Sequence, residues 1–146
     1  MNIKEYIAKS VNDAYSINDL PCSVTTVKTI NAIYRLDIPD AVIDAGWGFN
    51  GAGQYGAQCG LVEGALMLLS LLCRRRNFDR EAADQIFFKF AAEFEQKFGS
   101  LNCRELRPEG FAPDNPPLLC EKISVTAIEF VAEFLEKVFG IKPTPD

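Results

Sequence analysis

The sequence contains no histidine. This absence removes the side chain that most often acts as a general base near neutral pH. It also removes the Cys-His and Ser-His nucleophile pairs and the imidazole ligands of zinc and haem. The reactive groups that remain are carboxylates, lysines, tyrosines and the thiols of five cysteines. Any chemistry of this chain is therefore predicted to belong to its cysteine thiols.

Long apolar and long basic segments are also missing. The most apolar stretch, Ala65 to Cys73, is far shorter than the roughly 20 residues that a helix needs to span a bilayer. We therefore expect no membrane insertion. The net charge is -5 and the longest basic run is Arg74-Arg75-Arg76, whereas nucleic-acid phosphates require clustered Lys and Arg. We therefore expect no nucleic-acid binding.

The N-terminal sequence lacks the pattern of a signal peptide. Met1-Asn2-Ile3-Lys4-Glu5-Tyr6 is not a charged start followed by an apolar core of about 7 to 15 residues. A cytoplasmic location is expected, where disulfides stay reduced unless they are catalytic or sensing. Scattered cysteines in that compartment indicate redox, metal-binding or buried thiols more than a structural disulfide framework.

The composition and the apolar spacing predict one all-α domain over residues 1–146. Hydrophobic residues make up 48% and charged residues 24% of the chain, close to the globular average. Apolar positions recur with helical spacing, and no segment alternates at period two. We expect a compact bundle of about five helices around a central Leu-rich helix. The helices are predicted at Ile3–Ala14, about Pro21–Leu36 with Asp19 as N-cap, a short Pro39–Ala45, Cys59–Arg76, Asp79–Phe98 and about Leu118–Phe139.

Two features mark the predicted core. Leucines cover every side of the helix over Cys59–Arg76, which is typical of a central buried helix. Four phenylalanines at helical spacing form a stripe that predicts core packing more than a cofactor site: Phe87, Phe90, Phe94 and Phe98.

A glycine-rich segment over Gly46–Gly60 is predicted to be irregular. It follows no strand and lacks the G-x-G-x-x-G spacing, so a nucleotide site is weakly supported. Trp47 and Tyr55 are expected to anchor this loop to the core rather than to line a ligand site. Gly60 and Gly64 each cost about 1 kcal/mol relative to Ala inside a helix. They predict close contact with another helix or with a ligand.

Three cysteines fall at predicted helix N-termini, namely Cys22, Cys59 and Cys120. There the unpaired N–H groups and the helix dipole can lower a thiol pKa from about 8.5 by one to several units. Cys73 lies at the C-terminal end of the Leu-rich helix and is predicted to be a small core residue. No pair is spaced C-x-x-C, so a shared site must be assembled by the fold.

The cysteines and the glycine run resemble the C_GCAxxG_C_C family. This family has four hallmark cysteines and a glycine-rich run before a C-G-A-x-x-G motif, and its redox role is inferred largely from the cysteines. The resemblance implies that Cys22 is the first hallmark cysteine, that Cys103 is the third and Cys120 the fourth, and that Cys73 has no counterpart. Leu61 stands where the family motif has Ala. The matching segments are Gly46-Trp47-Gly48-Phe49-Asn50-Gly51-Ala52-Gly53 and Cys59-Gly60-Leu61-Val62-Glu63-Gly64.

Three functions remain open from the sequence. The first is thiol-disulfide exchange or electron transfer with an unidentified redox partner and with no cofactor in protein isolated in air. Cys59 would be its most activated thiolate, and Cys22, Cys103 or Cys120 its resolving partner. The second is a site in which the same four cysteines bind an iron-sulfur cluster or zinc. The third is a non-catalytic helical interaction module.

Both chemical hypotheses predict that the four hallmark cysteines converge at one end of the bundle, with Cys73 elsewhere. Glu63 lies one turn after Cys59, near enough to exchange a proton with it, although a carboxylate there would also oppose thiolate formation. Whether the chain is an enzyme, and whether it forms a homodimer, stays open.

Overall fold

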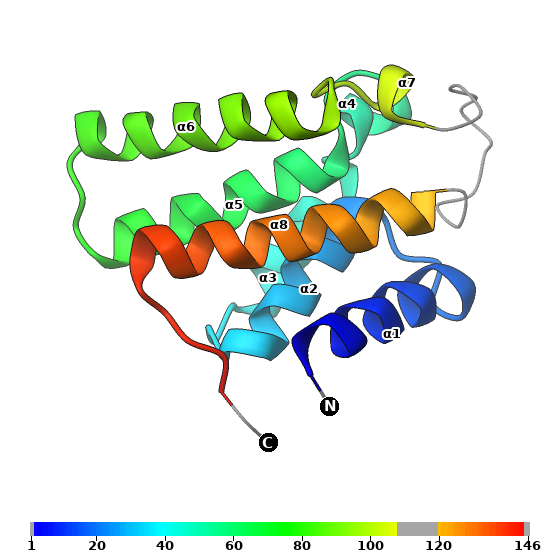
Figure 1. The fold of residues 1–146 in the computed structure, drawn as a ribbon, viewed down its shortest axis with the longest axis horizontal. Coiled ribbons are helices and arrows are strands. Elements are labelled where there is room, and N and C mark those ends of the chain that lie inside the picture. The colour runs from blue at the N-terminus through cyan, green and yellow to red at the C-terminus, as the bar shows by residue number, and fades with distance from the viewer. Residues whose placement is uncertain (1, 108–119, 145–146) are drawn as a thin grey trace.

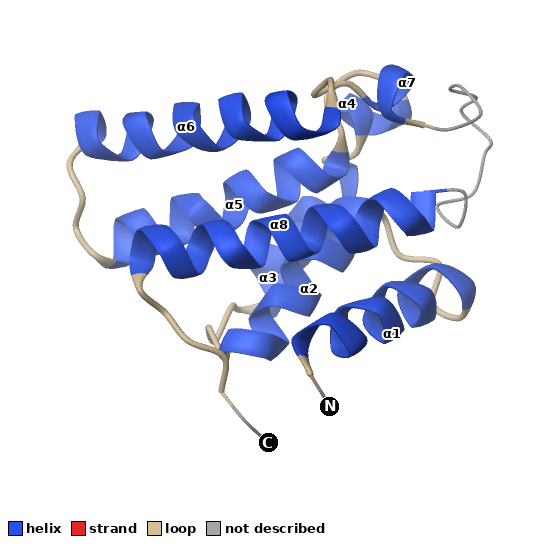
Figure 2. Ribbon diagram, viewed as in Figure 1, coloured by secondary structure: helices blue, strands red, loops and turns tan. Residues whose placement is uncertain are grey.

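The computed structural model describes residues 2–107 and 120–144. Within these ranges the regular elements are helices and no strand is present, so the prediction of an all-α fold is confirmed (Figure 2). Five helices of 13 or more residues form the body of the described structure: α1 (Ile3–Ser16), α2 (Cys22–Tyr34), α5 (Gly60–Arg75), α6 (Arg80–Phe98) and α8 (Glu121–Phe139).

Short helical turns make up the rest of the described elements: α3 (Asp40–Ala45), a 3-10 turn η1 (Gly46–Gly48), α4 (Gly51–Gln54) and α7 (Cys103–Leu106). Two of these turns lie in the glycine-rich segment that was expected to have no regular structure, so that expectation is wrong in detail. All four residues of α4 have positive φ angles, between 55° and 72°, so α4 is a left-handed turn. Glycine adopts such angles at no steric cost.

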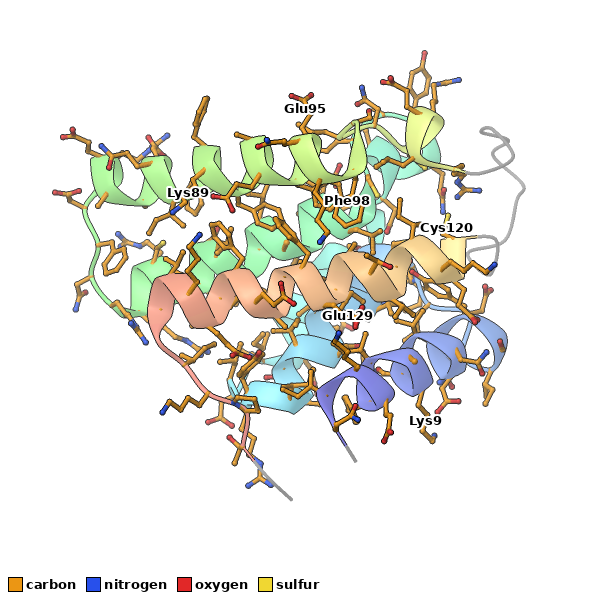
Figure 3. The ribbon with its side chains drawn as sticks, viewed as in Figure 1. Lys9, Lys89, Glu95, Phe98, Cys120 and Glu129 are labelled. Atoms are coloured by element: carbon orange, nitrogen blue, oxygen red, sulfur yellow. The ribbon has the colours of Figure 1, made fainter. Side chains whose placement is uncertain are left out.

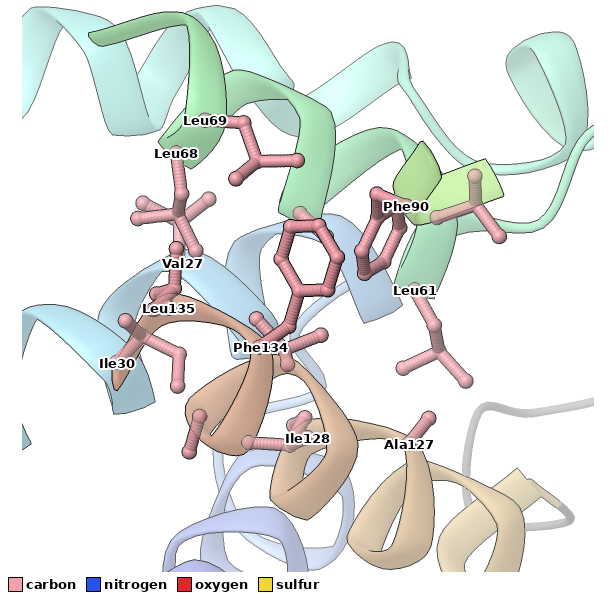
Figure 4. Close-up of a cluster of buried hydrophobic side chains, with 14 of the residues drawn as sticks. Val27, Ile30, Leu61, Leu68, Leu69, Phe90, Ala127, Ile128, Phe134 and Leu135 are labelled. Atoms are coloured by element: carbon pink, nitrogen blue, oxygen red, sulfur yellow. The ribbon is translucent and has the colours of Figure 1, made fainter. Parts of the chain in front are cut away.

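The Leu-rich helix α5 is central, as predicted. It packs against α2, α6 and α8, while α1 packs against α2 and α8 (Figure 1). Leu61, Leu68 and Leu69 are almost fully buried, and they face apolar side chains from the neighbouring helices (Figure 4). Cys73 is fully buried in the same cluster, which confirms its prediction as a core residue.

The phenylalanine stripe of α6 packs in the core, also as predicted. Phe90 and Phe94 are fully buried. The Phe90 ring meets Phe134 of α8 edge-on at a centroid distance of 5.3 Å, and Phe94 meets Phe130 in the same way at 6.1 Å. Edge-to-face pairs of this kind stabilise a core beyond the area they bury. No described helix has the length and apolarity that a membrane span requires.

Some helix ends lie where the sequence predicted them, and local capping residues explain why. Asp79 is the N-cap of α6, and its side chain accepts a hydrogen bond from the N–H of Ala82 at 2.8 Å. Gly99 ends the same helix with φ of 90°, the left-handed geometry that favours glycine. Gly140 ends α8 in the same way.

Other helix ends differ from the prediction. Pro21, not Asp19, is the N-cap of α2, and Asp19 instead adopts a positive φ of 51° in the preceding turn. Proline has the fixed φ that suits the start of a helix. Helix α8 begins at Glu121. The predicted start near Leu118 lies outside the described residues.

Helix α2 packs directly on α5. A Cβ added at Gly64 would lie 2.7 Å from the carbonyl oxygen of Ser23 and 3.0 Å from its Cα, and a Cβ at Gly60 would overlap the side chain of Asn50. The two glycines therefore let the α5 backbone lie directly on α2. Of the two explanations that the sequence left open, a helix contact accounts for Gly64, whereas the group nearest to Gly60 is the side chain of Asn50 in the glycine-rich segment.

We predict that Gly64→Ala lowers the free energy of unfolding, because the new methyl group meets rigid backbone. Overpacking of this kind costs about 1–3 kcal/mol, which exceeds the roughly 1 kcal/mol that alanine gains in helix propensity. Gly48→Ala is the matched control, since a Cβ there meets nothing within 4 Å, and it should change stability by less than about 0.5 kcal/mol. Urea denaturation measures both. Equal stability of the two variants would contradict this packing.

Candidate functional site

Each of the four hallmark cysteines lies at the start of a helix. Cys22 is the first residue of α2 and Cys103 the first of α7, while Cys59 is the N-cap of α5 and Cys120 the N-cap of α8. Helices α2, α5 and α8 begin at the same end of the molecule, on the right in Figure 1, and Cys120 is labelled there in Figure 3.

One pocket at this end is lined by all four of these cysteines. Cys73 is not part of it, because it lies in the core near the opposite end of α5. The cavity volume is about 20 Å³, which is room for about one water molecule. All five cysteines carry free thiols. The other residues that line the pocket are Pro21, Asn50, Gly51, Gln54, Gly60, Leu61, Leu106, Arg107 and Ile123.

Backbone hydrogen bonds hold the Cys59 and Cys103 segments together. The Cys59 N–H donates to the carbonyl of Leu101 at 2.8 Å, and the Cys103 N–H donates to the carbonyl of Ala57 at 2.7 Å. Gln58 and Asn102 thereby form an isolated antiparallel bridge. The side chains of both cysteines can then line one pocket although the two residues are 44 positions apart in the sequence.

The buried side chain of Asn50 ties the glycine-rich loop to the start of α2. Its Oδ1 accepts the N–H of Ser23 at 2.8 Å, and its Nδ2 donates to the carbonyl of Trp47 at 3.1 Å. The Ser23 hydroxyl in turn donates to the carbonyl of Gly46 at 2.6 Å. Asn50 therefore caps α2 from a distant part of the chain, which Pro21 cannot do because it has no polar side chain.

The thiols of Cys22 and Cys120 line the same pocket, and each shifts the pKa of the other. The pKa of Cys120 is lowered to about 7, first because Cys22 donates a hydrogen bond to its sulfur and then because the positive charge of Arg107 lies nearby. The pKa of Cys22 is raised well above the ordinary thiol value by that same hydrogen bond and by burial. Around pH 7 Cys120 is therefore about half ionised, while Cys22 keeps its proton.

The expectation that Cys59 is the most acidic thiol is wrong. The backbone N–H groups of Leu61 and Val62 do favour its thiolate, as its place at a helix N-terminus predicts. Burial opposes them more strongly, so that the pKa of Cys59 is raised to about 12. The N–H groups at the helix start do stabilise the Cys59 thiolate, but the cost of burying that thiolate in the folded protein is larger.

Arg107 is a site residue that the sequence analysis missed. It is only 8% exposed, and its Nε donates a hydrogen bond to the Cys103 sulfur at 3.3 Å. It follows Cys103 by four residues, a spacing that brings two side chains to one side of a helical turn. That spacing was the available signal, but the sequence could not show that the guanidinium would be buried among thiols.

Three residues that the sequence singled out lie outside the pocket. Glu63 is not among the residues that line the pocket, and burial raises the pKa of its carboxyl although the N–H of Ala52 opposes this rise. Trp47 is 49% exposed and Tyr55 is 73% exposed. The expectation that these two rings anchor the loop to the core is therefore wrong.

The arrangement of donor groups does not form a metal cage. Among residues 2–107 and 120–144, no group of three or more His, Cys, Asp or Glu side chains is placed to hold a metal ion. The four cysteines share a pocket, but the pairing of Cys22 with Cys120 and the contact of Arg107 with Cys103 give the sulfurs different partners. This geometry suits a protonated thiol beside a thiolate.

The fold and the pocket together define an all-α protein with four cysteines gathered at helix starts around one pocket. Comparison with protein families identifies the class: a family model described as "Putative redox-active protein (C_GCAxxG_C_C)" matches residues 20–134. The chain belongs to this C_GCAxxG_C_C family, which confirms the resemblance seen in the sequence. No curated protein matches the chain, and no solved structure does.

We predict that the thiolate of Cys120 forms as pH rises through about 7. Below that pH the thiol is protonated, so its ultraviolet thiolate absorbance disappears. In Cys22→Ala the hydrogen-bond donor is lost, and the pKa of Cys120 should rise toward 9.0, its ordinary value. The signal is isolated by subtracting the titration of the same protein carrying Cys120→Ser. Cys73→Ala is the control and should leave the midpoint unchanged. A midpoint that Cys22→Ala does not move would show that the pair is not hydrogen-bonded.

Proposed function

We propose that this chain carries out thiol-disulfide exchange, with Cys120 as the attacking thiolate and Cys22 as the resolving thiol. The observation that carries the proposal is that Cys22, Cys120 and Arg107 line one pocket, where the pKa of Cys120 is lowered to about 7. A thiolate is the species that attacks a disulfide, and a thiol with a pKa near the ambient pH is the most effective attacker. Cys120 meets this condition and Cys59 does not.

The proposed reaction begins when the Cys120 sulfur attacks one sulfur of a substrate disulfide. A bond forms between Cys120 and that sulfur, the substrate S–S bond breaks, and the other substrate sulfur leaves as a thiolate that takes a proton from water. Cys22 then attacks the Cys120 sulfur. The protein ends with a Cys22–Cys120 disulfide, and the substrate disulfide has been reduced to two thiols.

Arg107 has a clear part in this reaction. Its positive charge lowers the pKa of Cys120 and its Nε contacts Cys103, so it stabilises negative charge wherever it develops among these sulfurs. Cys59 and Cys103 form the other half of the pocket. Their thiols are placed to receive oxidation from the first pair by further exchange.

We predict that oxidised glutathione converts the reduced protein to a form two hydrogens lighter, with Cys22 joined to Cys120. Peptide mapping by mass spectrometry after alkylation of the free thiols identifies the pair. Cys22→Ala should stop at the glutathione adduct on Cys120, and Cys120→Ala should form neither adduct nor disulfide at a comparable rate. Cys73→Ala is the control and should oxidise as the natural sequence does.

The same protein, prepared without oxygen, distinguishes this function from metal binding. We expect substoichiometric metal and free thiols. Bound iron with visible absorbance, or one zinc per chain with no reactive thiols, would overturn the proposal in favour of a four-cysteine metal site. If the protein shows neither bound metal nor a reversible disulfide, the function that remains is that of a non-catalytic helical interaction module.

A further inference from the structure

The cavity that the four hallmark cysteines line is far smaller than a peptide. Its volume is about 20 Å³, and a single water molecule needs roughly 10–15 Å³ of such space. Cys59 and Cys120 are each only 6% exposed, and Arg107 is 8% exposed. A large disulfide must therefore widen the cavity before it meets Cys120, whereas a reactant of a few atoms fits the structure as it stands.

The lining of the cavity combines thiols, a positive charge and apolar walls. The Nε of Arg107 donates a hydrogen bond to the Cys103 sulfur at 3.3 Å, which fixes the guanidinium beside the thiols. Leu61, Leu106 and Ile123 cover other sides of the cavity. A charge held in such water-poor surroundings stabilises an opposite charge more strongly than it would in water. The cavity therefore suits a small neutral reactant that releases an anion when a sulfur attacks it.

We propose that this cavity is a site for hydrogen peroxide, which the Cys120 sulfur reduces to water with Arg107 and Cys22 beside it. Hydrogen peroxide is neutral, and it has only one oxygen atom more than the water molecule for which the cavity has room. This inference rests on the proposed function for its pair of cysteines, and it adds a second oxidant that the pair can use. The lowered pKa of Cys120 supports it, because the thiolate is the form of cysteine that attacks.

The first step oxidises Cys120 by two electrons. Its thiolate sulfur attacks one peroxide oxygen, so that an S–O bond forms and the O–O bond breaks. The other oxygen leaves as hydroxide, which becomes water by taking a proton from the solvent. Arg107 lines the same cavity, and its positive charge stabilises this hydroxide as it leaves. Cys120 is then a sulfenic acid.

The second step closes a disulfide. The Cys22 sulfur attacks the sulfenic sulfur of Cys120, so that an S–S bond forms and the S–O bond breaks. The hydroxyl group leaves with its electron pair and joins the proton of the Cys22 thiol as a second water molecule. The two cysteines have then given two electrons to one molecule of peroxide. Exchange with an external dithiol returns the pair to its reduced form.

Leu61 limits the size of the reactant. Its side chain lines the cavity and belongs to the apolar core. Truncation to alanine leaves unfilled space at this wall, because the surrounding structure relaxes only in part. Leu68 is the matched control, since it lies on the same helix and is equally buried, at 1% exposed, but does not line the cavity.

The test treats the reduced full chain with two oxidants that share the O–O bond and differ in bulk, hydrogen peroxide and tert-butyl hydroperoxide. Mass spectrometry of acid-quenched samples follows the Cys22–Cys120 disulfide. In Cys22→Ala, trapping with dimedone labels the sulfenic acid on Cys120. Each rate is divided by the rate of the same oxidant with free cysteine at the same pH. Cys73 is the internal control, because it is fully buried outside the cavity and should stay reduced.

We expect hydrogen peroxide to react roughly 100-fold faster with the protein than with free cysteine, the acceleration that one preorganised group in a buried site supplies. The bulkier oxidant should show no such acceleration. Leu61→Ala should reduce the difference between the two oxidants, and Leu68→Ala should leave it unchanged. Arg107→Gln should slow the reaction with hydrogen peroxide at least about 10-fold, whereas Arg107→Lys keeps the charge and should retain most of the rate.

Three results with the natural sequence would overturn this inference. The first is a reaction with hydrogen peroxide no faster than that of free cysteine. The second is equal acceleration of the two oxidants, since the cavity would then not select by size. The third is a disulfide between other cysteines. If hydrogen peroxide forms the Cys22–Cys120 disulfide and oxidised glutathione does not, the peroxide site stands and the attack on disulfides fails, so the two failures are distinguishable.

Discussion

The packing of α2 directly on α5 is the contact on which the rest of the site depends. It is possible because Gly60 and Gly64 present no side chain toward Ser23. The same contact places Cys22 and Cys59 along one pocket, since each lies at the start of one of these two helices. Asn50 then fills the space beside Gly60 and caps α2. A larger residue at either glycine would separate the helices and remove the cap together with the pocket.

The second constraint on the site is the competition between helix termini and burial. A helix N-terminus favours a thiolate by a modest amount, and burial away from water disfavours it by several times as much. Cys22, Cys59 and Cys120 all have the favourable position, yet the pKa is raised at Cys22 and at Cys59 and lowered at Cys120. The decisive difference is the hydrogen bond from Cys22 and the charge of Arg107. The pKa of a thiol at this site therefore depends on its neighbouring side chains more than on its place at a helix start.

The sequence predicted features that depend on local chemistry and on periodicity. The cap at Asp79, the stop at Gly99 and the buried Cys73 follow from residue types within a few positions of one another. The helix contact at Gly64 was one of two alternatives, because a missing side chain indicates that something lies close without indicating what.

Features that depend on distant parts of the chain were not predictable in this way. Asn50 caps a helix that begins 28 residues earlier, the difference between positions 50 and 22, and no local pattern shows such a bond. The acidity of Cys59 was predicted wrongly because its burial is decided by α2 and by the segment after α6.

The antiparallel bridge between Gln58 and Asn102 has a consequence for the order of folding. It joins the start of α5 to the end of α6, so these two consecutive helices and the turn between them form a hairpin that is closed at both ends. Contacts between neighbours in sequence form early because little chain entropy is lost in making them. We expect this hairpin to assemble first and to bring Cys59 and Cys103 together. Cys22 and Cys120, on helices outside it, meet only when the last long-range contacts close, so their pairing reports that the native structure is complete.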